Sequence, residues 1–290
     1  MIIFISPCIF FSSDSVEKTL KILISYCQNL KALTDNHGLT LIHKAAILGN
    51  CQFVKILMEA GLSLNAETKW GATPMDLAVT SGQFAIVGVF ISHYETSRYN
   101  QLLDNAIRAN QKKIVDFLVS RVPDQQPPVN HFGNTSMHYA VRDGKLEMVK
   151  SLLSCGWGKS NLQNQFLLSP LHIAVGEYAN IMKNARKASN SNNLCEDARK
   201  YAEIIKLISF SCNNHHCQDF DGNTALHIAV REGLIEIVEI LMPFYSDLLV
   251  ENKKGKTAVE VAYDKNEAIG DLLMKEIERR YELKSNFITI

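Results

Sequence analysis

The sequence has no excess of charge of either sign, because 30 Lys and Arg residues balance 30 Asp and Glu residues among 290. Binding of nucleic acid depends mostly on basic residues set against phosphates. The charge balance therefore argues against nucleic acid as the main partner.

The chain also lacks the short motifs of common catalytic sites. It contains no complete phosphate-cradling loop, no Gly-x-Ser-x-Gly and no His-Glu-x-x-His. From the residues alone we expect no enzyme, no cofactor and no metal site.

Paired cysteines and long hydrophobic runs are missing as well. The seven cysteines are an odd number and are scattered rather than set in a framework, which favours a reduced, cytoplasmic setting. The apolar start, MIIFISPCIFF, lacks a basic region before it and is too short to span a bilayer. We therefore expect no membrane insertion.

What the sequence does contain is an internal repeat. The segment from Asp219 to Met242, DFDGNTALHIAVREGLIEIVEILM, has a short helix pattern up to Gly233 and then a second one with an apolar face. Copies align on the position of His227 and are separated by steps of 34, 33, 28, 34, 34, 55 and 33 residues. The aligned positions are Ile9, His43, Asp76, Asp104, His138, His172, His227 and Glu260. The step of 28 indicates a shortened connection, and the step of 55 indicates an insertion.

These copies resemble the ankyrin repeat, whose motif runs D-x-x-G-x-T-P-L-H-x-A-A-x-x-G-x-x-x-x-V-x-x-L-L. The motif's turn glycine, two residues before the Thr, is present as Gly38, Gly71, Gly133, Gly222 and Gly255. The resemblance covers residues 6 to about 273. It implies an all-α repeat solenoid, an array of about eight helix-turn-helix repeats with short β-turn fingers, which binds other proteins.

The resemblance predicts one continuous solenoid over residues 1–290. Its parts are a degenerate N-terminal repeat over 1–34, repeats over 35–175, a repeat over 169–213 with an insertion at 176–200, repeats over 218–273, and a C-terminal cap helix over 274–290. A targeting segment is the alternative for the N-terminal part. We expect the polar, Asn- and Ser-rich insertion to be an exposed excursion with helical extensions at its ends.

The histidines of the motif invite a metal site, but one per repeat cannot converge on one ion. In the family this residue makes a structural hydrogen bond to backbone near the finger, and we expect that role for His43, His138, His172 and His227. A zinc site near Cys212–Cys217, with His215 and His216, is an alternative, although this segment aligns with an ordinary loop between repeats. Asn65 partly matches asparagines that are hydroxylated in ankyrin repeats, but a structural role in the loop is the favoured interpretation.

The finger tips are the best candidates for a partner-binding site. Aromatic residues dominate interface hot spots, and several tips carry one, although a tip aromatic can also serve to pack neighbouring fingers. The candidate residues are Trp70, His131, Phe132, Phe166 and Phe220 at the tips, with Arg142 and Arg231 beside them on the concave face. We expect a monomer that binds a protein partner, as a cytoplasmic adaptor or an effector secreted into a host cell. Recognition through the insertion at 176–200 is the alternative.

Overall fold

The computed structural model describes residues 22, 33–93, 98–121, 129–157, 162–187 and 192–288. Apart from Ile22 and its last two residues, the expected degenerate repeat over 1–34 lies outside them. The chain divides into two compact units, residues 1–118 and residues 119–290.

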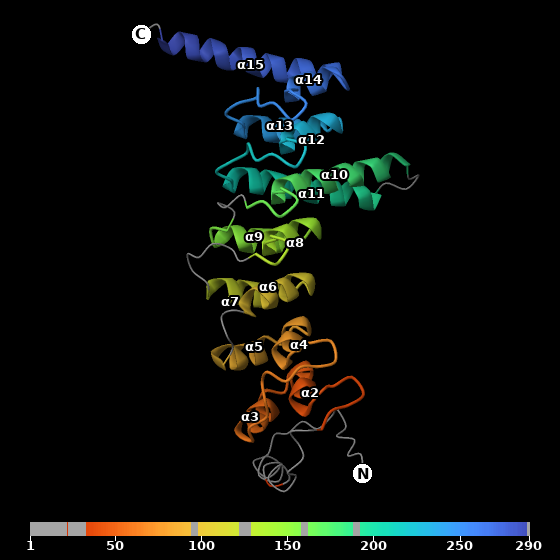
Figure 1. Ribbon diagram of the computed structural model, residues 1–290, viewed down its shortest axis with the longest axis vertical. Helices are drawn as coiled ribbons and strands as arrows, with labels where there is room; N and C mark the ends of the chain where they lie inside the picture. Colours follow the sequence, from red (N-terminus) through yellow and green to blue (C-terminus); the bar gives the residue numbers. More distant parts are fainter. Residues whose placement is uncertain are drawn as a thin grey trace. The chain divides into compact units, whose positions relative to one another are not determined.

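The first unit consists of pairs of short helices (Figure 1). The pairs are α2 (Leu41–Leu48) with α3 (Cys51–Glu59), α4 (Pro74–Thr80) with α5 (Phe84–Phe90), and α6 (Tyr99–Arg108) with α7 (Lys112–Ser120), where the 3-10 turn η2 (Ile91–His93) follows α5. The first helices of successive pairs, α2, α4 and α6, pack on one another, and α3 packs on α5. We call the first helix of each pair the inner helix and the second the outer helix.

The second unit repeats this arrangement with longer elements near its middle and its end (Figure 1). The pairs are α8 (Ser136–Arg142) with α9 (Leu146–Ser154), α10 (Pro170–Lys187) with α11 (Asn192–Ser211), α12 (Ala225–Arg231) with α13 (Ile235–Leu241) and the 3-10 turn η4 (Met242–Phe244), and α14 (Ala258–Tyr263) with α15 (Glu267–Ile288). Over the described ranges, β pairing is limited to the isolated bridge between Glu251 and Thr257. The predicted all-α repeat architecture is confirmed.

Many of these helices are too short to be stable alone in water. Their starts are fixed by a threonine whose side chain and third following residue satisfy each other's backbone N–H groups. Such a capping box begins α2, α4, α8, α12 and α14, at Thr40, Thr73, Thr135, Thr224 and Thr257. Packing between repeats stabilises the helices further. Small buried residues such as Ala78 and Ala140 let inner helices approach one another, and Leu57 and Ile86 of the outer helices fill the core between the helix layers.

The turn at the end of most inner helices contains a left-handed residue, and Asn110 occupies this position in the fourth repeat. Its φ is 59°, and its N–H donates to the carbonyl of Ile107 at 3.0 Å. Asparagine tolerates this conformation better than other side chains. Asn110 thus takes the place of the glycine found at this turn as Gly49, Gly82, Gly144 and Gly233.

The described part of the insertion is helical, since residues 176–187 continue α10 and residues 192–200 begin α11. The predicted helical extensions are therefore confirmed. The expectation that the insertion is wholly exposed is wrong at Tyr178 and Ala179, which are buried. The Tyr178 hydroxyl donates to Glu236 Oε2 of α13 at 2.7 Å, so the extension is fastened to the next repeat.

The C-terminal cap is continuous with the last outer helix, because α15 begins at Glu267 rather than near residue 274. Arg280 fixes this helix to the preceding repeat: its Nη2 donates to the Met242 carbonyl at 2.8 Å, and its Nη1 donates to the Tyr245 carbonyl. Glu276 Oε1 in turn accepts from Arg280 Nε at 2.8 Å. The long charged helix is therefore held to the preceding repeat by a side chain that pairs with backbone carbonyls of η4 and of the residue after it.

Candidate partner-binding surface

Each finger is a turn built on one side-chain oxygen. In the fifth repeat, Asn130 Oδ1 accepts from the N–H of Phe132 at 2.9 Å and from the N–H of Asn134 at 3.0 Å. In the sixth, Asn164 Oδ1 accepts from Phe166 and Leu168 in the same way. The same double acceptance is made by Asp35, Thr68, Asp219 and Asn252. The backbone at each tip is thereby held in one conformation without support from the tip side chain.

The four predicted tip aromatics are exposed. Trp70 exposes 71% of its surface, Phe132 46%, Phe166 62% and Phe220 71%. Phe132, Phe166 and Phe220 stand on successive fingers of the second unit, and Trp70 stands on a finger of the first. Exposure on this scale shows that these rings are not core residues of the fingers.

The contacts that the tip rings do make are with residues of the tips themselves. Trp70 stacks on His37 with the ring centroids 5.3 Å apart, and Phe132 lies beside the predicted His131 with the centroids 3.9 Å apart. The ammonium group of Lys253 lies 4.5 Å from the centroid of the Phe220 ring. These contacts orient the rings while leaving most of their surface open.

Neighbouring fingers are joined by a backbone hydrogen bond at the tip. Gln165 N–H donates to the Phe132 carbonyl at 3.0 Å, and Lys253 N–H donates to the Asp221 carbonyl at 3.0 Å. In the first unit Lys69 N–H donates to the His37 carbonyl at 3.1 Å. These bonds join three pairs of neighbouring fingers, so the members of each pair are not independent loops.

The motif histidines tie each inner helix to the following finger, as predicted. His138 Nδ1 accepts from the N–H of Thr135 at 3.0 Å, so its proton lies on Nε2, which donates to the Leu168 carbonyl at 3.1 Å. The same tie joins His43 to Ala72, His172 to Asn223 and His227 to Lys256. Burial lowers the pKa of His138 to about 4, so its ring is neutral at physiological pH.

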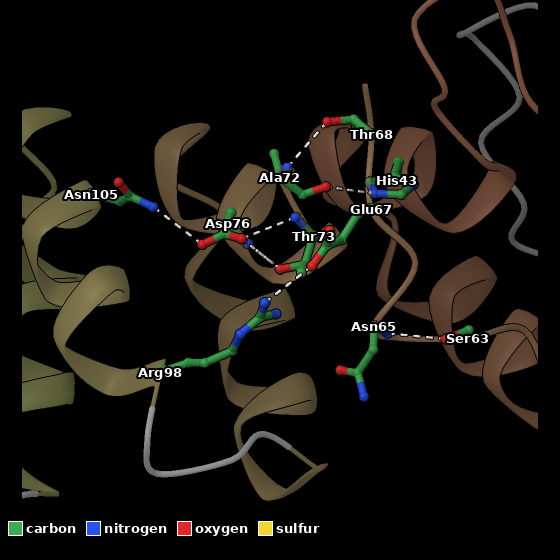
Figure 2. A network of polar contacts seen from close by, with 10 residues as sticks. All are labelled: His43, Ser63, Asn65, Glu67, Thr68, Ala72, Thr73, Asp76, Arg98 and Asn105. Carbon is green, nitrogen blue, oxygen red and sulfur yellow. Dashed lines mark hydrogen bonds and ion pairs between the residues drawn. The ribbon is translucent and has the colours of Figure 1, made fainter. Parts of the chain in front are cut away.

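The third repeat has an aspartate in place of this histidine (Figure 2). Asp76 Oδ2 accepts from Thr73, while its Oδ1 faces Asn105 of α6. Figure 2 also shows Asn65, whose side chain is directed away from this network and is exposed. Its N–H donates to Ser63 Oγ at 3.2 Å, so the structural role in the loop is supported for its backbone.

Arg142 and Arg231 occupy the last turns of α8 and α12, where a cation also favours the helix dipole. Each is half-exposed and pairs with the acid that follows it: Arg142 Nε with Asp143 at 3.0 Å, and Arg231 Nε with Glu232 at 3.4 Å. The other Glu232 oxygen lies 2.7 Å from Lys183 Nζ on the α10 extension. The two arginines thus stand at equivalent positions, as the sequence predicted, and lie beside compensating charge.

The alternative zinc site has no geometric support. His215 Nε2 donates to the Ser209 carbonyl at 2.7 Å, and His216 Nε2 lies 2.8 Å from Ser246 Oγ, so the two rings have separate partners. Burial raises the pKa of the Cys212 thiol to about 12, which disfavours the thiolate that zinc requires. Nowhere in the part of the chain that the structure describes do three or more His, Cys, Asp or Glu side chains gather as metal ligands.

The sequence did not reveal a cleft between the seventh finger (residues 219–223) and the eighth finger (residues 252–256). It lies beside Arg231 and is lined by basic residues of the eighth finger, including Lys254 and Lys256. The run Lys253-Lys254-Gly255-Lys256 was the available signal, because it places three lysines on one short finger.

A family model described as ankyrin repeats, in three copies, matches residues 11–102, 103–184 and 194–283. The chain belongs to the ankyrin repeat family, whose repeats are protein–protein interaction modules.

Several relatives are similar over part of their length. Human Rabankyrin-5 is 30% identical over 145 residues, which are 48% of this chain and 12% of that protein. The E3 ubiquitin-protein ligase KEG of Arabidopsis thaliana is 22% identical over 247 residues, 77% of this chain and 14% of the ligase. The interferon antagonist OPG040 of vaccinia virus is 28% identical over 153 residues, 52% of this chain and 45% of the antagonist. The chain spans less than half the length of each of these relatives.

Among the described residues, no helix combines the length and the apolar composition needed to cross a bilayer.

Proposed function

We propose that this chain is a non-catalytic protein-recognition module, which binds a segment or domain of a partner along its finger tips and the adjoining ends of its inner helices. The observation that carries the proposal is the exposure of Phe132, Phe166 and Phe220 on the tips of three successive fingers. Trp70 supplies the corresponding ring in the first unit, and Arg142 and Arg231 supply polar contacts.

The geometry suits binding because the tips are already ordered. Each tip ring extends from a turn closed by hydrogen bonds from backbone N–H groups to a side-chain oxygen, as at Asn130 and Asn164. Binding therefore carries little entropic cost of ordering the loop. Exposed aromatic rings of this kind supply large apolar area when a partner covers them. The exposed rings contribute little to the fold, which is the combination expected of binding residues.

We infer a monomeric adaptor or scaffold that works in the cytoplasm. The similarity to a viral interferon antagonist, OPG040, makes a host-directed effector the alternative setting.

The test is affinity capture from a cell lysate with wild-type protein and two variants. The first combines Trp70→Ala and Phe166→Ala. The second, the control, is Phe210→Ala, which removes an equally exposed ring (77%) from the outer helix α11. The tip variant is expected to lose the proteins that wild type captures while melting within a few degrees of it, and the control is expected to keep them. Unchanged capture by the tip variant, or a large loss of its stability, would refute the proposed surface.

A second candidate is recognition through the α10–α11 extension at 176–200. The extension is a built structure, because Tyr178 is bonded to Glu236 and Lys183 pairs with Glu232. A third variant in the same capture experiment, Arg186→Glu with Lys187→Glu, reverses two exposed charges near the end of α10 while leaving both anchors in place. Capture that survives this change dismisses the extension, and capture that only this change abolishes selects it.

A further inference from the structure

The cleft between the seventh and eighth fingers has a volume of about 230 Å³. Four of its lining residues are cations, and they come from three different elements: Arg231 from α12, Lys254 and Lys256 from the eighth finger, and Lys265 from the turn before α15. Asp221 and Asp264 are its two carboxylates. The cleft is therefore basic in a chain whose net charge is zero.

Two of the cations are partly neutralised and two are not. Lys256 pairs with Asp264, and Arg231 makes a long contact of 3.4 Å with Glu232. Lys254 and Lys265 form no ion pair with any residue of the described ranges. Two ammonium groups are thus available to an incoming anion without loss of an internal pair.

The backbone that carries these cations is fixed. Asn252 Oδ1 accepts from the N–H groups of Lys254 and Lys256, at 2.9 and 3.2 Å. The Lys256 carbonyl accepts from His227 Nε2, which secures the eighth finger to α12. A ligand therefore meets charges whose main-chain positions are set before it binds.

We propose that this cleft takes an acidic segment of the partner polypeptide, with Lys254 and Lys265 as the main contacts of its carboxylates. The proposal rests on the proposed protein-recognition function and specifies the chemistry of the partner. The cleft adjoins the tip surface, because the ammonium group of Lys253, on the same finger as Lys254, lies 4.5 Å from the centroid of the exposed Phe220 ring. A partner that covers Phe220 can therefore reach the cleft with a neighbouring segment of its chain.

The two carboxylates decide between a polypeptide and a nucleic acid. A nucleic acid presents closely and regularly spaced phosphates, which Asp221 and Asp264 in the same lining would repel. An acidic peptide separates its carboxylates with neutral residues and can place them opposite the lysines alone. The mixed lining therefore favours the peptide.

The test is fluorescence anisotropy with a fluorescein-labelled decapeptide of alternating Glu and Ser. The variant is Lys254→Glu with Lys265→Glu, and the matched control is Lys55→Glu with Lys113→Glu, two exposed lysines of the first unit. Wild type and control are expected to bind the peptide equally, and the cleft variant is expected to bind at least about tenfold more weakly. A decapeptide with Gln in place of Glu is expected not to bind.

Three results would overturn the proposal: equal binding by the cleft variant, equal binding of the Gln peptide, or tighter binding of a ten-nucleotide oligothymidine. The titration needs no captured partner, so its failure leaves the tip-aromatic surface standing. Loss of the tip surface in the capture experiment, with peptide binding intact, would reject the proposed function alone.

Discussion

The side-chain amide of Asn105 donates a hydrogen bond of 3.1 Å to Oδ1 of Asp76 (Figure 2). In four other repeats a histidine at the position of Asp76 reaches the backbone of the next finger, as His43 reaches Ala72. Aspartate is too short for that reach, and in this repeat the tie runs to a side chain of the next inner helix instead. The link between repeats is kept although its chemistry differs.

Asp76→Ala should destabilise the protein by about 1 to 3 kcal/mol, because it leaves the Thr73 N–H and the Asn105 amide without their partner in a largely buried site. Asn105→Ala should cost less, since Asp76 keeps its cap on Thr73. Urea unfolding of both single variants and the double variant measures the coupling, expected to be about 0.5 kcal/mol or more. Strictly additive losses would mean that the bond carries no stability.

Most of the fold could be predicted because the repeat period and the Thr-x-x-His capping pattern act locally. The bond between Asp76 and Asn105 could not, since it joins two positions 29 residues apart and Asn105 stands where the motif specifies no residue. The start of α6 at Tyr99 could not be predicted either, because the fourth repeat has Gln101 at the position of the capping threonine. Without the capping threonine, nothing in the sequence marks where that helix begins.

The candidate site was predictable only where it follows the repeat. The tip aromatics lie one or two residues before the turn residue of each finger, and the two arginines share one offset, so the repeat placed them correctly as exposed or half-exposed residues. The burial of Tyr178 was missed because the insertion was judged by its average polarity, whereas one tyrosine is enough to anchor a helix. The cleft was missed because it depends on side chains of separate elements meeting in space.

Stability should fall on mild acidification because of the motif histidines. Burial holds the pKa of His138 at about 4, below its ordinary value of 6.5, and lowers the pKa of His43, His172 and His227 as well. The unfolded chain therefore binds more protons than the folded one between about pH 6.5 and 4. The stability that His138 contributes is complete above that window and is lost as the pH falls through it.

For His138 the loss should amount to about 3 kcal/mol across the window, at about 1.4 kcal/mol for each pKa unit. The measurement is urea unfolding of wild type and of His138→Gln at pH 7, 5.5 and 4.5. The variant should be less stable at pH 7 and should show a shallower dependence on pH. The difference between the two proteins isolates this histidine from the carboxylates, and identical slopes would contradict the assignment.

Two glycines of similar backbone conformation should differ in the stability lost on substitution, because only one of them lies at a hydrogen bond between fingers. Gly222 and Gly233 both have left-handed backbones, with φ of 77° and 68°. A Cβ added to Gly222 would lie 2.5 Å from the backbone nitrogen of Lys253, whose N–H joins the two fingers, whereas at Gly233 nothing lies within 4 Å. Gly233→Ala should therefore cost only the backbone strain of about 1 to 2 kcal/mol. Gly222→Ala should lower the free energy of unfolding, measured in urea, by at least about twice as much, because the added Cβ also displaces the eighth finger. Equal losses for the two variants would show that this finger can shift at no energetic cost.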